Sequence, residues 1–272
     1  MICFFDAVLG IALFFCRPVP LSVSAMDVGQ GTASLISLNG AFILVDGGVD
    51  SGTAFEIEKM MGYRRRIDAV ILSHPHADHY GGLESVIKSY NIGAFLYDGE
   101  PADSADLDRI IAEARKEAKV VPVSSGGSIS FEGSRISILQ AEGKKSDPNS
   151  NSLVIKADLP GFSALFPGDI GIEGESELIE KAGSILDSDI LVAPHHGSAG
   201  SSGTPFIEAV SPKIAVFSVG INNRYGFPKE EAVERYAALG VPTMRTDESG
   251  TVMFSLNDAS SLKIKRLNQA LP

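Results

Sequence analysis

The chain has 272 residues, of which 44% are hydrophobic, and this length and composition predict a globular protein with one large domain or two small ones and exclude wholesale disorder. The formal net charge of −11 argues against broad electrostatic adhesion to nucleic acid or anionic lipid, although a local site can still hold a phosphate. Both cysteines, Cys3 and Cys16, lie near the N-terminus, which excludes a disulfide-built core and a thiolate metal site in the rest of the chain.

Residues 1–20 form an apolar N-terminal segment. Its run at 2–16 is shorter than the roughly twenty residues that a membrane-spanning helix needs. The length suits the core of a signal peptide, and residues 23–25 resemble a cleavage site, but no positive charge precedes the run. Three interpretations stay open: a membrane anchor, a removed signal, and an apolar segment packed on the domain. We expect a membrane-associated or exported protein, with a cytoplasmic location as the alternative.

Residues 21–272 are predicted to form one domain. Short β-rich runs separated by Gly-Gln-Gly and Asn-Gly turns open it and predict an antiparallel meander. The predicted strands lie at 21–28, 33–38, 41–46, 67–73, 94–98, 119–123, 127–131, 134–141, 152–159, 161–169, 189–196, 214–219, 251–256 and 261–267. The predicted helices lie at 55–63, 81–90, 104–118, 175–183 and 229–240. Two strand-rich halves with interspersed helices predict two sheets packed face to face and covered by helices, a four-layer α/β arrangement.

The histidines of this chain are confined to two short stretches. All five lie in HPHADH (74–79) or in the pair at 195–196. Each stretch follows or ends a predicted buried strand, and so does Asp169. A buried strand fixes the backbone, and the loop after it leaves the side chains free to bind. A single histidine is usually only a hydrogen-bonded residue, but four ligand-type side chains within six residues indicate a metal site.

The first stretch offers ligands for two ions. His74 and His76 are two residues apart, so in an extended segment they point the same way and can bind one ion. Asp78 and His79 follow a turn and can bind a second ion beside it. Asp169 can bridge the two ions with one carboxylate oxygen each.

The second stretch completes the predicted site. Neighbouring residues on a strand point to opposite faces, so only one of His195 and His196 should reach the second ion. We favour His196 as the ligand and expect His195 to face the substrate, which makes Asp78 and His195 the candidate catalytic residues. Two divalent ions roughly 3.5–4 Å apart lower the pKa of a bound water and stabilise the charge that develops on attack. Imidazole and carboxylate ligands suit zinc first and manganese as the alternative.

Further motifs support a family resemblance. In chain order they are MDVGQGTASLI (26–36), ILVDGG (43–48), ILSHPHADHYGGL (71–83), NSLVI (151–155), LFPGD (165–169), LVAPHHGS (191–198) and SVGINNRYGFP (218–228). With them the chain resembles metallo-β-lactamase-fold hydrolases, whose fold is an αββα four-layer sandwich. More narrowly, it is similar to the soluble C-terminal hydrolase domain of ComEC-type DNA-uptake competence proteins.

The resemblance implies a function and further site residues. It implies a metal-dependent hydrolase, with a two-metal phosphodiesterase or nuclease acting through a metal-bound hydroxide as the leading version and DNA as the first candidate substrate. The alternatives are a small-molecule hydrolase (a lactonase, β-lactamase or phosphocholine-type esterase) and a non-catalytic binding domain. Asp27 and Asp46 would orient the metal ligands. We expect substrate contacts from Asn151, Ser198, Asn223, Arg224 and Tyr225.

The chain departs from the family pattern in four respects. Many members place a further histidine before the bridging aspartate, and here the first site has only two imidazoles and Asp169. Thr32 stands where the family usually has an acidic residue, and Phe227 stands where it usually has histidine. The competence proteins also carry a multi-spanning membrane channel, whereas this chain has at most one short apolar segment. Its oligomeric state is left open.

Overall fold

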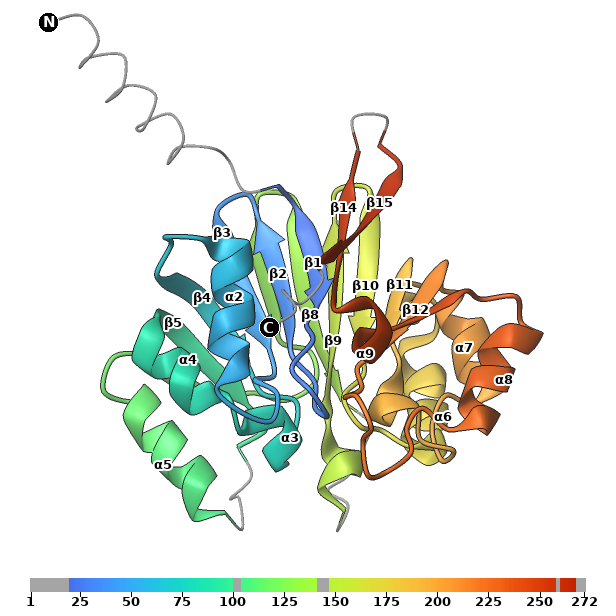
Figure 1. Ribbon diagram of the computed structural model, residues 1–272, viewed down its shortest axis with the longest axis horizontal. Coiled ribbons are helices and arrows are strands. Elements are labelled where there is room, and N and C mark those ends of the chain that lie inside the picture. Colours follow the sequence, from blue (N-terminus) through green and yellow to red (C-terminus); the bar gives the residue numbers. More distant parts are fainter. Residues whose placement is uncertain (1–19, 100–103, 141–146, 258–259, 268–272) are drawn as a thin grey trace, which may run out of the picture.

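The fold consists of two β-sheets packed face to face between two layers of helices (Figure 1). The computed structural model describes residues 20–99, 104–140, 147–257 and 260–267; the N-terminal segment, on which the anchor and signal interpretations depend, lies outside the described residues. The two sheets and their covering helices confirm the predicted four-layer α/β arrangement. Within the described part of the chain, no helix is both long and apolar enough to span a bilayer.

The first sheet has eight strands in the order β15-β14-β1-β2-β3-β4-β5-β6. Its strands are β1 (Ser22–Ala25), β2 (Ser34–Leu38), β3 (Ala41–Val45), β4 (Arg66–Ile71), β5 (Asn91–Tyr97), β6 (Lys119–Pro122), β14 (Thr251–Leu256) and β15 (Leu262–Leu267). The predicted meander is present, because β1 and β3 both pair antiparallel with β2. The C-terminal strands also join this sheet, because β14 pairs with β1.

The second sheet has seven strands in the order β13-β12-β11-β10-β9-β8-β7. Its strands are β7 (Ser128–Phe131), β8 (Ser134–Gln140), β9 (Leu153–Leu159), β10 (Phe162–Phe166), β11 (Ile190–Val192), β12 (Ile214–Phe217) and β13 (Thr243–Arg245). Strands β10 to β13 run parallel to one another, as β3 to β6 do in the first sheet. In each sheet the C-termini of several parallel strands thus lie at the same end of the sheet, where side chains of the following loops can meet.

Helices cover the outer face of each sheet, with α2 to α5 on the first and α6 to α8 on the second (Figure 1). Their bounds are α2 (Gly52–Met61), α3 (Ala77–Tyr80), α4 (Leu83–Ser89), α5 (Ala105–Ala114), α6 (Ile172–Ala182), α7 (Thr204–Val210), α8 (Glu230–Ala238) and α9 (Thr246–Ser249). In α5, Leu107, Ile110, Ile111 and Ala114 are buried at helical spacing, and Ser104 caps the N-terminus by accepting from the Leu107 N–H.

The core follows the alternation of each strand. In β4 and the residues after it, Ala69 and Ile71 pack between the sheets, whereas Val70 and Leu72 pack under the helices. Both faces of the strand are therefore buried, which explains its continuous apolar sequence. This burial holds the backbone at the point where HPHADH begins.

The structure differs from the predicted elements near the site. HPHADH contains a short helix, α3, and is not a purely extended segment followed by a turn. The strand expected at 189–196 ends at Val192, and Pro194–Gly197 form a 3-10 turn. Strand β13 and helices α7 and α9 were not among the predicted elements.

Candidate metal centre

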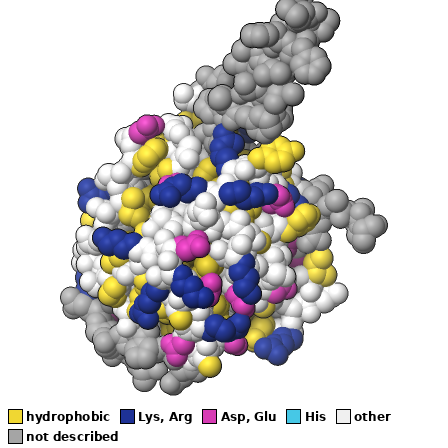
Figure 2. All heavy atoms as spheres, turned by 90° about the vertical axis from the view of Figure 1, so that its left-hand side faces the viewer, with side chains coloured by type: hydrophobic (Ala, Val, Ile, Leu, Met, Phe, Trp, Pro, Cys, Tyr) yellow, Lys and Arg dark blue, Asp and Glu magenta, His cyan; other side chains and the backbone are white. Residues whose placement is uncertain are grey.

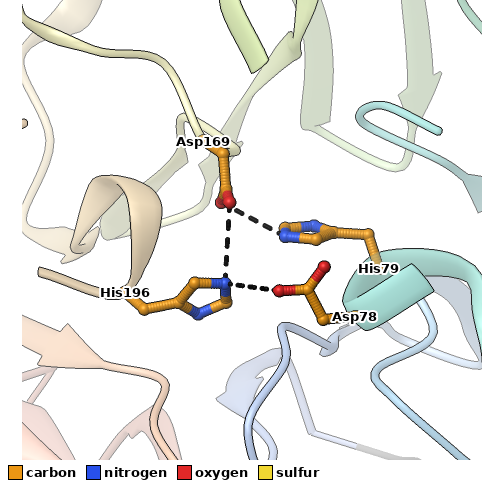
Figure 3. Close-up of side chains that lie close together, drawn as sticks. All are labelled: Asp78, His79, Asp169 and His196. Carbon is orange, nitrogen blue, oxygen red and sulfur yellow. Dashed lines mark ion pairs between the residues drawn. The ribbon is translucent and has the colours of Figure 1, made fainter. Parts of the chain in front are cut away.

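The site lies where loops from both sheets meet. His74 follows β4 of the first sheet, and α3 carries Asp78 and His79. Asp169 follows β10 and His196 follows β11, both in the second sheet. Figure 3 shows Asp169 and His196 opposite His79 and Asp78, with the four side chains pointing toward one another. The centre is therefore built by both sheets together.

Four side chains are close enough to share an ion. Asp78, His79, Asp169 and His196 each offer one ligand atom, and these atoms lie within 4.8 Å of one another. The Nε2 atom of His79 is 3.2 Å from Oδ1 of Asp169. The Nε2 atom of His196 is 3.3 Å from Oδ2 of Asp78 and 3.6 Å from Oδ2 of Asp169. This is the set predicted for the second ion, with Asp169 as the bridging residue.

The histidine rings are held through one nitrogen and free at the other. The Nδ1 atom of His79 lies 2.8 Å from Oδ2 of Asp46, and that of His196 lies 2.9 Å from the Ser218 carbonyl oxygen. The Nδ1 atom of His74 lies 3.0 Å from the Ser73 hydroxyl. The Nε2 atoms of all three rings are buried and make no hydrogen bond. Buried polar atoms are rarely left without a partner, so these residues fit a bound divalent metal ion.

The charges of the cluster also fit a cation. Burial alone would raise the pKa of Asp169, but His79 and His196 hold it well below its usual value. Burial opposes ionisation of Asp78 as well, yet the adjacent His196 ring, whose Nε2 atom is 3.3 Å from Oδ2, lowers the pKa of Asp78 to about 2. Burial would lower the pKa of His79, but the carboxylates of Asp169 and Asp46 outweigh it and raise the pKa well above the usual value. The two candidate carboxylate ligands are thus ionised at neutral pH, and a metal ion would displace the proton on His79.

The pair predicted for the first ion is arranged less closely. The Nε2 atom of His74 lies 3.9 Å from Oδ2 of Asp169. The ring of His76 packs edge-on to that of His74, with centroids 4.7 Å apart, and His76 is half-buried. Burial, together with the nearby His79, lowers the pKa of His74 well below its usual value, so its ring is neutral and can donate a lone pair. His74 is thus placed to bind an ion at Asp169, while His76 lies at the more open side.

His195 lies beside the cluster and is more open than His196. Its side chain is 30% exposed, and its Nε2 atom is 3.8 Å from Oδ2 of Asp169. Both His195 and His196 have positive φ values, 50° and 54°, so they do not occupy a strand. The predicted strand alternation is therefore wrong for these two residues: a left-handed turn, and not a β-pleat, separates the two rings.

Several contacts of the site were not predicted. Ser73 donates from its backbone N–H and its hydroxyl to the Asp46 carboxylate, and the Asp169 N–H donates to the Ser152 hydroxyl. The Ser218 carbonyl orients His196, and Thr32 lies near the same Nδ1 atom at 3.4 Å. Thr32 also donates its N–H to the Asp78 carbonyl. Serine hydroxyls and backbone carbonyls leave no signal in a single sequence that would mark such roles.

Gly31 explains why the Gly-Gln-Gly turn sits against the site. A Cβ at position 31 would lie 2.4 Å from the Asp78 carbonyl oxygen, which is closer than real Cβ atoms come. The Gly31 carbonyl also accepts from the Ser218 hydroxyl. Glycine is therefore required here for the turn to approach both Asp78 and the Ser218 segment that orients His196.

The remaining residues predicted for the site make contacts with nearby loops and with one metal-ligand candidate. Asp46 contacts His79, as the predicted orienting role requires. The carboxylate of Asp27 accepts from the Gly29 N–H of its own turn, at 3.5 Å. Asn151 ends the 3-10 turn before β9, and its carbonyl accepts from Gln140. The Ser198 hydroxyl accepts from the Gly200 N–H, within the loop after the histidine pair.

The predicted substrate loop divides into a structural and an exposed part. The side-chain amide of Asn223 accepts from the Phe227 N–H and donates to the Gly220 and Phe227 carbonyls, so it closes the loop on itself. Arg224 and Tyr225 are exposed. The side chains of Arg224 and Tyr225 are therefore open to solvent, whereas the Asn223 amide bonds within the loop.

The two-sheet fold and the His/Asp cluster indicate a protein of the metallo-β-lactamase class, and comparison with known proteins confirms the family. Residues 26–221 match the model of the Metallo-beta-lactamase superfamily, and the chain belongs to that family. The chain is similar to competence protein ComA of Neisseria gonorrhoeae, with 35% identity over 90% of this chain and 34% of that protein. It is also similar to ComE operon protein 3 of Bacillus subtilis, with 31% identity over 70% of this chain and 25% of that protein. The chain thus spans about a third or less of the length of these relatives.

A solved structure supports the fold alone. The metallo hydrolase Igni18 from Ignicoccus hospitalis superposes with a TM-score of 0.59 over 87% of this chain and all of that one, at 16% identity. The similarity to competence proteins agrees with the resemblance expected from the motifs at 26–36, 191–198 and 218–228.

Proposed function

We propose that this chain is a two-metal phosphodiesterase whose leading substrate is DNA. The proposal depends on one observation about His74, His79 and His196. Their Nδ1 atoms are in contact with protein oxygen atoms, whereas their Nε2 atoms are buried, make no hydrogen bond and lie near the Asp169 carboxylate. Zinc is the first metal to test and manganese the second, because the donors are imidazoles and carboxylates.

The proposed metal ligands form two groups that share Asp169. Asp78, His79, Asp169 and His196 would hold one ion, and His74 with His76 and the other side of Asp169 would hold the second. Ions bound there would lower the pKa of a water molecule and neutralise charge on a phosphate.

Two residues near the cluster have supporting roles in the proposal. Asp46 keeps the His79 ring oriented by accepting from Nδ1. His195 lies at the half-exposed edge, with Nε2 close to Asp169, and is placed to hold or transfer a proton on the substrate side.

A local phosphate site is compatible with the formal net charge of −11. Figure 2 shows that Lys and Arg side chains are interspersed with Asp and Glu on the face at the left of Figure 1. On the helices of that face, Lys88 and Arg109 pair with Glu84, and Lys116 pairs with Glu113. The described basic residues of this face therefore form no continuous groove, and we expect nucleic-acid binding to be weak, salt-sensitive and centred on the metal ions.

The substrate part of the proposal draws on the relatives. One of them is named as a competence protein, and the chain resembles the hydrolase domain of proteins that take up DNA. A phosphodiester in DNA is therefore the first substrate to test, and a DNA-uptake context beside a membrane is the setting that we propose.

The test combines metal content with hydrolysis. Wild-type protein and Asp169→Asn are analysed for bound zinc and manganese, and each is assayed on a DNA oligonucleotide and on bis(p-nitrophenyl) phosphate with either metal. Asp189→Asn is the matched control, because Asp189 is also a hydrogen-bonded carboxylate but lies away from the cluster. It precedes β11, whereas the histidine pair follows β11, and it accepts from Ser163 and pairs with Lys213.

We expect about two ions per wild-type chain, with both metal content and hydrolysis reduced in Asp169→Asn and unchanged in Asp189→Asn. Cleavage of the small diester without cleavage of DNA would reassign the substrate to small molecules. A folded wild-type chain that binds no more than one ion and cleaves neither substrate would refute the proposal.

A further inference from the structure

A row of aromatic rings leads from the metal centre to the surface. The ring of His196 stacks on Phe227, with centroids 6.2 Å apart and an interplanar angle of 18°. Phe227 stacks in turn on Tyr225, at 5.6 Å and 15°. Phe227 also meets His195 edge-on at 6.0 Å. Tyr225 is 44% exposed, so the row ends in an aromatic ring that is partly open to solvent.

The loop that carries this row is held in place before any ligand binds. The Asn223 amide closes the turn around Phe227, and the Gly226 N–H donates to the Asn223 carbonyl. The Lys229 N–H donates to the Gly197 carbonyl, directly after the histidine pair. A Cβ on Gly197 would lie 2.6 Å from the Pro228 Cβ, so glycine lets the loop pack against the histidine turn. The position of Tyr225 is therefore tied to that of His196.

Two cations flank the stacked rings. The Arg224 guanidinium lies 4.8 Å from the Tyr225 ring centroid, and the Lys229 ammonium lies 5.6 Å from that of Phe227. Arg224 is exposed, and its guanidinium donates to the Tyr225 hydroxyl at 2.7 Å. A partly exposed aromatic ring with cations beside it, next to a proposed site for phosphate, offers partners for the base and the phosphate of one nucleotide.

We propose that Tyr225, backed by Phe227, is a subsite that stacks the nucleobase next to the scissile phosphate, while Arg224 pairs with a flanking phosphate. This inference rests on the proposed phosphodiesterase function and adds what is recognised besides the phosphate. Stacking on an aromatic ring tolerates every base, because each base has a π-face. The subsite therefore selects for the presence of a base and not for its identity.

The test compares a single-stranded oligonucleotide with one whose bases are removed at several consecutive positions. Both probes are bound to metal-loaded protein and followed by fluorescence anisotropy, and cleavage of both is measured as kcat/KM. The variants are Tyr225→Ala, which removes the ring, and Tyr225→Phe, which keeps the ring and loses the hydroxyl that accepts from Arg224. Phe227 is left intact, because it contacts both His195 and His196.

A second tyrosine serves as the matched control. Tyr63 is 77% exposed and lies just before β4, at the opposite end of that strand from His74. We expect Tyr63→Ala to behave as the wild type in both measurements.

We expect the wild type to prefer the base-containing strand by at least about fivefold, the lower limit for one stacked base. Tyr225→Ala should bring this ratio close to one, and Tyr225→Phe should keep it. Equal binding and cleavage of the two probes by the wild type, or an unchanged ratio in Tyr225→Ala, would overturn the subsite. If the wild type cleaves neither probe, the phosphodiesterase function fails, and the anisotropy ratio still decides the subsite.

Discussion

His79 donates a hydrogen bond from Nδ1 to Asp46, across 2.8 Å, and both side chains are fully buried. Ser73 donates to the same carboxylate from its backbone and its hydroxyl, so Asp46 is fixed from two sides. The ring of His79 is consequently aimed at Asp169 before a metal ion arrives. An imidazole that is oriented in this way loses little freedom when it becomes a ligand.

Asp46→Asn should weaken metal binding without unfolding the chain. Asp46 has a positive φ of 59°, a region that asparagine tolerates, so the exchange adds no backbone strain. The amide supplies one acceptor oxygen in place of two, which leaves either His79 or Ser73 without its partner. We expect a metal affinity about 10–100-fold lower, measured by competition with a chromogenic chelator. Asp189→Asn should retain the wild-type affinity, and an equal loss in both variants would contradict the orienting role.

Metal removal should lower the thermal stability, because the ligands come from both sheets. A metal ion that binds only the folded state contributes about 2.7 kcal/mol at a hundredfold excess over its Kd. For a domain of this size that amounts to about 5–10 °C in Tm. We expect EDTA to remove this increment from the wild type, and Asp169→Asn to show little increment at all, in melting curves followed by circular dichroism. A wild-type Tm that ignores both metal and chelator would count against the site.

Glu175 should make stability depend on pH. Burial raises its pKa to about 7 against the opposing hydrogen bonds from the Gly203 and Ser202 N–H groups. The folded state therefore keeps a proton that the unfolded chain releases near pH 4.5. This contribution to the free energy of unfolding is complete below pH 4.5 and is lost as the pH rises to about 7.

The pH effect is measured with Glu175→Gln, which cannot titrate. Urea unfolding of the metal-loaded proteins at pH 5 and pH 8 gives the difference between wild type and variant at each pH. We expect the wild type to lose stability relative to the variant as the pH rises, by no more than about 3 kcal/mol. A difference that is the same at both values would show that Glu175 titrates normally.

Gly31→Ala should disturb the metal centre from the side of the Gly-Gln-Gly turn. The added methyl would press on the Asp78 backbone carbonyl and move either Asp78 or the turn. Overpacking of this kind costs about 1–3 kcal/mol, and we expect weaker metal binding as well. Gly127→Ala is the control, because its Cβ would meet neighbours only at ordinary contact distances of 3.6 Å and beyond. Unfolding by urea and chelator competition on both variants separate the two cases.

The sequence predicted those parts of the molecule that local patterns encode. Alternating and β-branched runs predicted most strands, and the helical spacing at 104–118 predicted α5. The ligand types were visible because HPHADH is contiguous. The left-handed turn at His195 and His196 was missed, because an apolar run before a histidine pair reads as a continuing strand. The contacts of Ser73, Ser152 and Ser218 depend on segments that are distant in the chain, and no local pattern reports them.

Strand β1 lies between β2 and β14, and Ala25 pairs with both Ser34 and Val252. During synthesis its first neighbour emerges from the ribosome almost at once, whereas the second arrives only after nearly all of the domain has been made. Until then one edge of β1 has no partner and can pair with another chain. The late hairpin of β14 and β15 therefore closes that edge, and a nascent chain stalled before residue 251 would expose β1 as an aggregation-prone edge strand of the sheet.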